Sequence, residues 1–153
     1  MKKQPIHIVW FKRDFRLVDN EALFHAHQSG VPLLLICFFE PSVMDYADSD
    51  VRHWRFVYES IQDLNKKLAP FNARIYFFHD EVKTVFSKLI QEYNVKTIFS
   101  HQEIGNKVTY DRDVEMKAFF DSNDIAWKEF QLHGVIRKLK SRQNWDQRWE
   151  QVM

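Results

Sequence analysis

In this 153-residue chain, the side chains best suited to binding or catalysis lie in one charged stretch near the start. Within IHIVWFKRDFRLVDNEAL, five charged side chains fall in positions 12–19: Lys12, Arg13, Asp14, Arg16 and Asp19. An arginine can hold a phosphate or carboxylate through two parallel hydrogen bonds, and an aspartate can fix a loop or begin a helix. The stretch therefore has the chemistry of an anion-binding loop or of a salt-bridge network.

The sequence shows no familiar arrangement for bond-making catalysis. It has no Ser-His-Asp set and no paired catalytic carboxylates, and its seven histidines lack zinc-binding spacing. It has three glycines and neither a GxGxxG nor a GxxxxGK[ST] phosphate loop. We therefore assign no catalytic residue and no metal ligand, and we look for a binding site instead.

Apolar runs alternate with helical periodicities along the chain. Predicted strands cover residues 7–11, 32–39, 73–79, 96–100 and 126–131, and predicted helices cover residues 20–30, 50–68, 80–93 and 109–123. We expect Asp19 and Asp80 to cap the first and third helices. The alternation predicts an α/β fold, namely a doubly wound, Rossmann-like, five-stranded parallel sheet with helices on both faces.

The charged stretch lies where such a fold binds ligands. Ligands of doubly wound sheets bind beyond the carboxyl ends of the strands, where the strand order reverses. With the first strand central, the segments KRDFR, EPSVMDYADSDVR and HQEIGN border this crevice. Phe38 and Phe39 end the second strand. Because side chains alternate between the two faces, at most one of them is expected to form an aromatic wall of the crevice.

The composition argues against an independent DNA-binding domain. Such a domain carries an excess of basic residues, whereas the net charge here is +1. Cys37, the single cysteine, lies in an apolar run, as is common in a reducing cytoplasm, so a cytoplasmic location is expected. No apolar run reaches the ~20 residues that a membrane-spanning helix needs, so we expect no membrane association.

The last 22 residues, 132–153, differ from the rest in composition. Trp145 and Trp149 stand four positions apart, which predicts one face of a helix with roughly 300–500 Å² of aromatic surface. So large an aromatic patch is expected either to fold back on the domain or to meet a surface beyond residue 153. We therefore expect one domain over residues 1–131 and a connector over residues 132–153 that leads toward a further domain.

The segment VWFKRDFRLVDNEAL resembles the N-terminal signature of the DNA photolyase/cryptochrome family. The match runs residue by residue from Trp10 to Leu23, with Lys12 where an arginine is usual. YDRDVE (110–115) is similar to the family's Arg-Asp segment, and GVIRKLKSRQNWDQRW is similar to the connector of some bacterial photolyase-like proteins. The resemblance implies an antenna domain that precedes a larger helical domain, which holds FAD and the DNA groove in this family.

The resemblance also implies which residues hold the antenna chromophore. Arg13 and Arg52 match arginines that contact it in deazaflavin-binding members, and Glu103 matches an acidic contact. The predicted cofactor-binding residues are therefore Arg13, Phe38, Phe39, Arg52 and Glu103. The second acidic residue of the deazaflavin-binding pattern is absent, because its position is occupied by Gly105. Flavin mononucleotide, ribolumazine, methenyltetrahydrofolate, deazaflavin and an empty site all remain open.

Three functions remain open at this stage. The first is the light-harvesting domain of a deoxyribodipyrimidine photolyase, a carbon-carbon lyase that splits pyrimidine dimers in DNA with light-excited FAD. This segment would be inactive alone, and its partners would be the FAD-binding domain of the same protein and, through it, damaged DNA. The second is the same domain of a cryptochrome-type photoreceptor. The third is a stand-alone nucleotide-binding α/β module.

Overall fold

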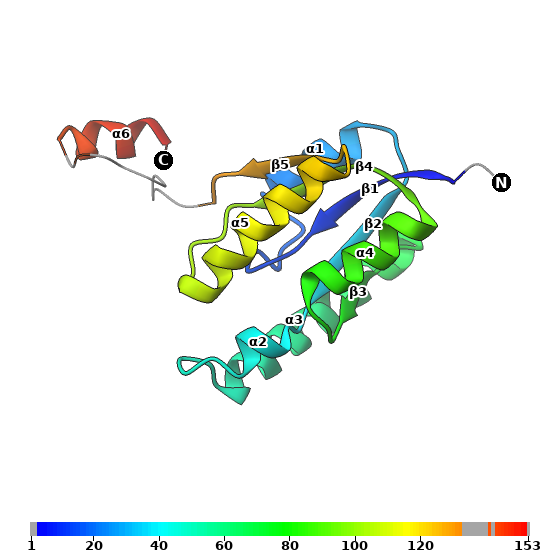
Figure 1. The fold of residues 1–153 in the computed structure, drawn as a ribbon, viewed down its shortest axis with the longest axis horizontal. Coiled ribbons are helices and arrows are strands. Elements are labelled where there is room, and N and C mark those ends of the chain that lie inside the picture. Colours follow the sequence, from blue (N-terminus) through cyan, green and yellow to red (C-terminus); the bar gives the residue numbers. More distant parts are fainter. Residues whose placement is uncertain (1–2, 133–140, 142, 153) are drawn as a thin grey trace.

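A five-stranded parallel sheet forms the centre of the protein in a computed structural model, which describes residues 3–132, 141 and 143–152 (Figure 1). The strands stand in the order β3-β2-β1-β4-β5. They are β1 (Pro5–Trp10), β2 (Leu33–Phe38), β3 (Ile75–Phe78), β4 (Asn94–His101) and β5 (Ala126–Phe130). The predicted doubly wound, five-stranded parallel sheet is confirmed, and β1 lies at its centre between β2 and β4.

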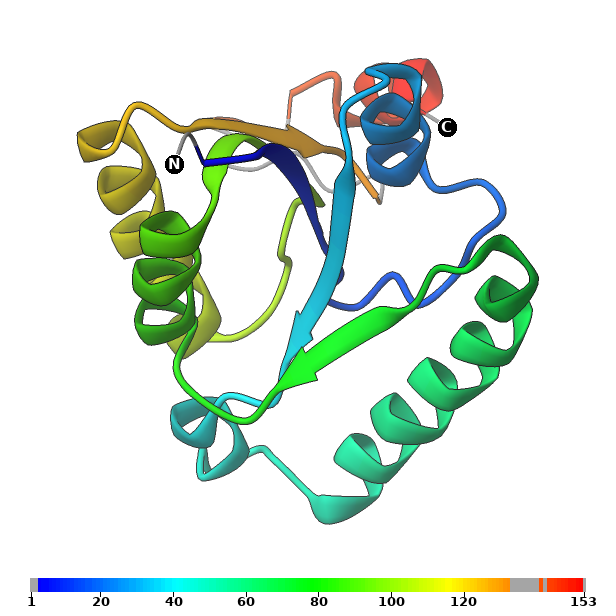
Figure 2. The same ribbon diagram turned by 90° about the vertical axis from the view of Figure 1, so that its right-hand side faces the viewer.

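Helices cover both faces of the sheet. They are α1 (Glu21–Gln28), α2 (Pro41–Met44), α3 (Val51–Leu68), α4 (Val82–Glu92), α5 (Lys107–Ser122) and α6 (Trp145–Val152), with a short 3-10 helix, η1, at Ala69–Phe71. Figure 2 shows α4 and α5 on one side of the sheet and α1 and α3 on the other. This division follows from right-handed crossovers, because β1 to β3 progress toward one edge and β4 to β5 toward the other.

Each face of the sheet has its own apolar core. Even-numbered residues of β1, such as Ile8 and Trp10, pack with α4 and α5. On the other face, Val9 of β1 and Phe11, which directly follows the strand, pack with α1 and α3. Both sets are buried, which explains why β1 reads as a continuous apolar run rather than an alternating one.

Two helix caps differ from the sequence prediction. Asn20 caps α1, since its side-chain oxygen accepts a hydrogen bond from the Leu23 amide at 2.9 Å, and Asp19 precedes it with a left-handed φ of 54°. Glu81, not Asp80, holds the N-cap position of α4, and it makes no side-chain capping bond. The predicted caps at Asp19 and Asp80 are therefore wrong by one residue each.

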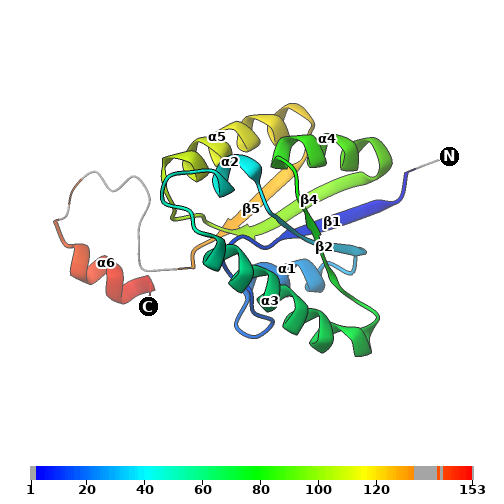
Figure 3. The same cartoon turned by 90° about the horizontal axis from the view of Figure 1, so that it is seen from below.

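Of the predicted connector over 132–153, residues 133–140, 142 and 153 lie outside the described residues. Within it, α6 carries Trp145 and Trp149, whose rings stack at 6.4 Å and stay 45% and 41% exposed. Figures 1 and 3 show α6 apart from the sheet and its covering helices. That these residues lead to a further domain stays a prediction.

Candidate functional site

Charged side chains gather at the carboxyl edge of the sheet. The loops after β1, β2 and β4 contribute, together with the N-terminal half of α5. We refer to six of these residues as the carboxyl-edge cluster: Lys12, Arg13, Glu40, Glu103, Arg112 and Asp113. Because the strand order reverses between β1 and β4, this edge is where a doubly wound sheet binds ligands.

The ion pair between Arg13 and Glu103 joins the loops that follow β1 and β4. Arg13 Nε lies 2.5 Å from Glu103 Oε1, and the arginine side chain is 58% exposed whereas the glutamate is 4% exposed. Gly105 passes close by, since a Cβ atom there would lie 2.8 Å from Glu103 Oε1 and 2.3 Å from Thr109 Oγ1. A Cβ atom here would force the Thr109 and Glu103 side chains to shift, so the glycine leaves room for the pair in this geometry.

Arg112 ties the loops after β2 and β4 to α5. Its Nη1 lies 2.5 Å from Glu40 Oε1, and its Nη2 lies 2.9 Å from Asp113 Oδ1 and 3.6 Å from Glu103 Oε2. All four side chains are largely buried. Burial raises the pKa of Glu40, and the Arg112 guanidinium opposes that rise. Arg112 thus holds three carboxylates that would otherwise be costly to bury.

Lys12 is buried between Asp113 of α5 and the β5 residues Trp127 and Glu129. Its Nζ lies 2.9 Å from Asp113 Oδ2 and 3.8 Å from Glu129 Oε1. The ammonium also sits 4.4 Å from the ring centre of Trp10 and 4.8 Å from that of Trp127. Burial lowers the pKa of Lys12, while the Asp113 carboxylate favours its charged form. The carboxyl edge is therefore held by paired charges that lie against aromatic rings.

Asp14 is a structural residue of the loop after β1. Its carboxylate accepts hydrogen bonds from the Lys12 amide at 2.9 Å and from Asn20 Nδ2 at 3.3 Å, and it lies 2.6 Å from His101 Nδ1. Burial would raise the pKa of Asp14, but the contacts with His101 and the Lys12 amide outweigh it, and the pKa is lowered overall. This network fixes the loop that presents Arg13.

Phe38 and Phe39 lie on opposite faces of the sheet, as strand alternation predicts. Phe38 is buried and packs edge-to-face against Trp10, with ring centres 5.7 Å apart. Phe39 is buried in the other core, 5.7 Å from the ring of Trp54. Each ring already has aromatic neighbours, so the structure gives both residues a packing role, and a chromophore-wall role stays a prediction.

Arg52 lies at the start of α3, with its side chain 84% exposed. Its Nε donates to Asp50 Oδ1 at 2.8 Å, and Asp50 is the N-cap of the same helix. Nearby, Asn106 Nδ2 donates to both carboxylate oxygens of Asp48 at 3.1 Å, which ties this loop to the start of α5. The contacts described for Arg52 do not join it to the carboxyl-edge cluster, so its ligand role stays a prediction.

Sequence reasoning identified Arg13 and Glu103 separately but did not foresee their pairing. It also assigned no role to Arg112 or to the contact between Asp14 and His101. One signal for Arg112 was available, since YDRDVE places four charged residues inside a helix that covers the sheet. Within the described residues, no group of histidine, cysteine or carboxylate side chains is arranged to hold a metal ion, and no helix has the length and apolar character to cross a membrane.

The sequence matches known proteins over most of its length. The family model described as DNA photolyase matches residues 7–146. Among curated proteins, Cryptochrome-2 of Gallus gallus is 31% identical over 86 residues, covering 56% of this chain. Cryptochrome DASH of Solanum lycopersicum is 25% identical over 108 residues, covering 67% of this chain. The aligned regions make up 15% and 19% of those proteins, so this chain matches a small part of each.

Solved structures share the fold. An archaeal photolyase from Sulfolobus tokodaii aligns with a TM-score of 0.77 at 20% identity, covering 96% of this chain and 34% of that one. A cryptochrome from Synechocystis aligns with a TM-score of 0.75 at 23% identity, covering 86% and 28%. A class III photolyase from Agrobacterium tumefaciens aligns with a TM-score of 0.74 at 20% identity, covering 94% and 29%.

Proposed function

Because this chain belongs to the DNA photolyase family, we propose that it is the N-terminal light-harvesting domain of a deoxyribodipyrimidine photolyase. In this proposal, residues 1–131 form the antenna domain and residues 132–153 lead to a C-terminal FAD-binding domain. The intact protein would repair pyrimidine dimers in damaged DNA, and the 153-residue segment would bind a pigment without splitting dimers itself.

The observation that supports this function best is the half-exposed Arg13 guanidinium beside the buried Glu103 carboxylate at the carboxyl edge. A fixed cation next to an acceptor suits a conjugated ring that carries a phosphate or another anionic group. Flavin mononucleotide and ionised deazaflavin have this chemistry. The pigment would supply absorption of near-ultraviolet or blue light, and this chain's residues would bind it, orient it and limit its contact with water.

A flavin is the first pigment to test. The Sulfolobus tokodaii photolyase that shares this fold is described with two FAD molecules and with the implication of a novel light-harvesting cofactor. Arg13, Arg52 and Glu103 are the polar residues that we assign to the pigment. Phe38 and Phe39 are both buried, so their contribution is expected to be the shape of the core behind the pigment.

A second candidate function is the equivalent domain of a cryptochrome. The relative from Gallus gallus and the structure from Synechocystis both carry that name. The α/β domain does not distinguish the two functions, since dimer repair takes place in the FAD-binding domain in this family. An assay of dimer splitting under blue light by the two domains joined would separate them, because a cryptochrome would contain FAD and leave the dimers intact.

Pigment binding tests the proposal directly. We would titrate the chain with flavin mononucleotide, FAD, deazaflavin, ribolumazine and methenyltetrahydrofolate, following fluorescence, and use ATP as a competitor. The proposal predicts saturable binding of one pigment that ATP does not displace. Binding of ATP with no binding of any pigment would favour a stand-alone nucleotide-binding module instead.

A further inference from the structure

An apolar groove lies on the face of the sheet that α1 and α3 cover. α1 packs over β1, β4 and β5, whereas α3 packs over β3. The two helices therefore leave a gap above β2, with a volume of about 1290 Å³. This groove is separate from the carboxyl-edge cluster, since none of the cluster's six residues lines it.

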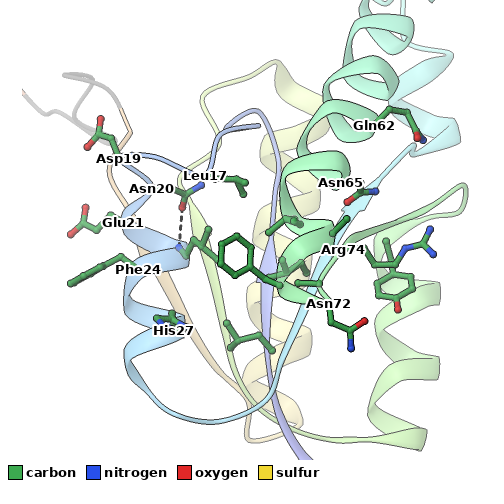
Figure 4. Close-up of a pocket in the computed structure, with 18 residues that line it drawn as sticks. Leu17, Asp19, Asn20, Glu21, Phe24, His27, Gln62, Asn65, Asn72 and Arg74 are labelled. Carbon is green, nitrogen blue, oxygen red and sulfur yellow. Dashed lines mark hydrogen bonds between the residues drawn. The ribbon is translucent and has the colours of Figure 1, made fainter.

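The lining of the groove is apolar at its floor and polar at its rims. Leu23, Leu33 and Leu68 line it and pack against the core below. Phe71 of η1 also lines it, yet this side chain is 79% exposed. Figure 4 shows Asp19 and Glu21 along the α1 rim and Arg74 on the opposite wall, which places acidic groups at one rim and a cation at the other.

The chain also contains an amphipathic helix whose apolar stripe is half exposed. Trp145 and Trp149 of α6 stand four positions apart, so they share one face of the helix. Arg148 lies on one flank of that stripe, three residues after the first tryptophan. Asp146 and Glu150 each follow a tryptophan directly, so they lie on the other flank.

We propose that α6 docks in the groove between α1 and α3 of its own chain, with Trp145 and Trp149 against the leucine floor. The charges of the two surfaces are complementary in this arrangement. Arg148 would face the acidic α1 rim, while Asp146 and Glu150 would face Arg74. This match sets the direction of α6 in the groove.

The path of the chain makes docking within one molecule possible. Phe130, the last residue of β5, stacks on His25 of α1 with ring centres 5.0 Å apart. The chain therefore leaves the sheet beside a wall of the groove. Residues 131–144 join β5 to α6 and can span about 45–50 Å at most. A compact domain of this size has a radius of gyration of about 14 Å, so the groove is within reach.

A double-mutant cycle on the full 153-residue chain tests the proposal. One variant replaces Trp145 and Trp149 by alanine, the second is Phe71→Ser, and the third combines them. The thermal midpoint of unfolding is measured for each. Since Phe71 is largely exposed, Phe71→Ser should have little effect on an empty groove. With α6 docked, the tryptophan variant and Phe71→Ser should each lower the thermal midpoint by about 3–6 °C. The variant that combines them should lower the midpoint by clearly less than the sum of the two separate effects.

The matched control is Phe56→Ser, the same change on α3 at a residue that is 69% exposed and does not line the groove. Its effect should be small and should add to that of the tryptophan variant. Charge reversal tests the direction of α6 in the groove. Arg148→Glu should lower the thermal midpoint, and adding Glu21→Arg to that variant should partly restore it.

Two results would overturn the proposal. Additive effects of Phe71→Ser and the tryptophan variant would show that α6 does not occupy the groove. A coupling that weakens on dilution, together with a dimer mass in sedimentation, would show that the helix comes from a second copy. Coupling that is independent of concentration in a monomer supports docking within the chain.

Discussion

At the scale of single residues, the charges at the carboxyl edge are stable because each has a partner of opposite sign. Arg112 contacts Glu40 and Asp113, and Lys12 contacts Asp113 from the other side. Removing one member of such a buried set lowers the free energy of unfolding by more than the intact set adds to it, because the remaining charge is buried without a partner of opposite sign. The cluster therefore fixes the loops of the candidate site with little tolerance for single changes.

Arg112→Ala should lower the free energy of unfolding by about 3–5 kcal/mol, because Glu40 loses its partner and remains buried. Urea unfolding followed by circular dichroism measures the change. Arg52→Ala is the control, since that arginine is exposed and pairs with an exposed carboxylate, and its unfolding curve should match wild type. Equal effects of the two substitutions would contradict the role given to Arg112.

The pKa of Asp14 is lowered in the folded protein, so its contribution to stability depends on pH. The contribution is fully present above the unfolded-state pKa of about 3.9 and is lost as the pH falls through the lower folded-state pKa. Asp14→Asn should therefore destabilise the protein at pH 7, and its difference from wild type should shrink as the pH falls below about 4. Asp19→Asn, at an exposed carboxylate, is the control. A difference that stays constant from pH 7 to pH 3 would argue against this assignment.

At the scale of elements, the loop from β4 to α5 depends on a glycine. A side chain at Gly105 would meet Thr109 Oγ1 and Glu103 Oε1, and it would approach Arg13 Nη2 at 3.1 Å. Asn106 directly after it caps α5 by accepting a hydrogen bond from the Thr109 amide at 3.2 Å. The start of α5 and the Arg13–Glu103 pair thus rely on the same short segment.

Gly105→Ala should destabilise the protein by about 1–3 kcal/mol through overpacking and should also weaken pigment binding, because Glu103 must move. Gly30→Ala is the matched control, since its Cβ would meet no atom within 4 Å and its cost comes from a φ of +69° alone. Both variants are compared by urea unfolding and by pigment titration. Loss of binding in Gly30→Ala, or normal binding in Gly105→Ala, would contradict this account.

The elements themselves were predictable from the sequence, because buried strands leave long apolar runs and helices leave a 3.6-residue period. The exact first and last residues of the helices and strands were less predictable. Asp19 and Asn20 are adjacent and both suit an N-cap, so only the backbone geometry decides between them. The short helix α2 was missed because four residues carry too little periodicity to be recognised.

At the scale of the whole molecule, the sheet order brings together residues that are about 90 positions apart. The position of Arg13 after β1 and of Glu103 after β4 followed from the topology, so the candidate site was predictable in outline. Their pairing was not, because it depends on side-chain directions in two loops. Arg112 was missed for a related reason, since its role depends on how far α5 reaches over the strand ends.

The most direct test of the account is the affinity of the chain for flavin mononucleotide with and without Arg13. If the carboxyl edge binds the pigment, Arg13→Ala should weaken binding by about one to two orders of magnitude, through loss of a charge-assisted contact. Arg16→Ala, at an exposed arginine that pairs with Asp19, should bind as wild type does. Should flavin mononucleotide not bind, the pigment that binds in the wild-type panel takes its place. Equal affinities of the wild type and both variants, or a wild type that binds no pigment, would contradict the account.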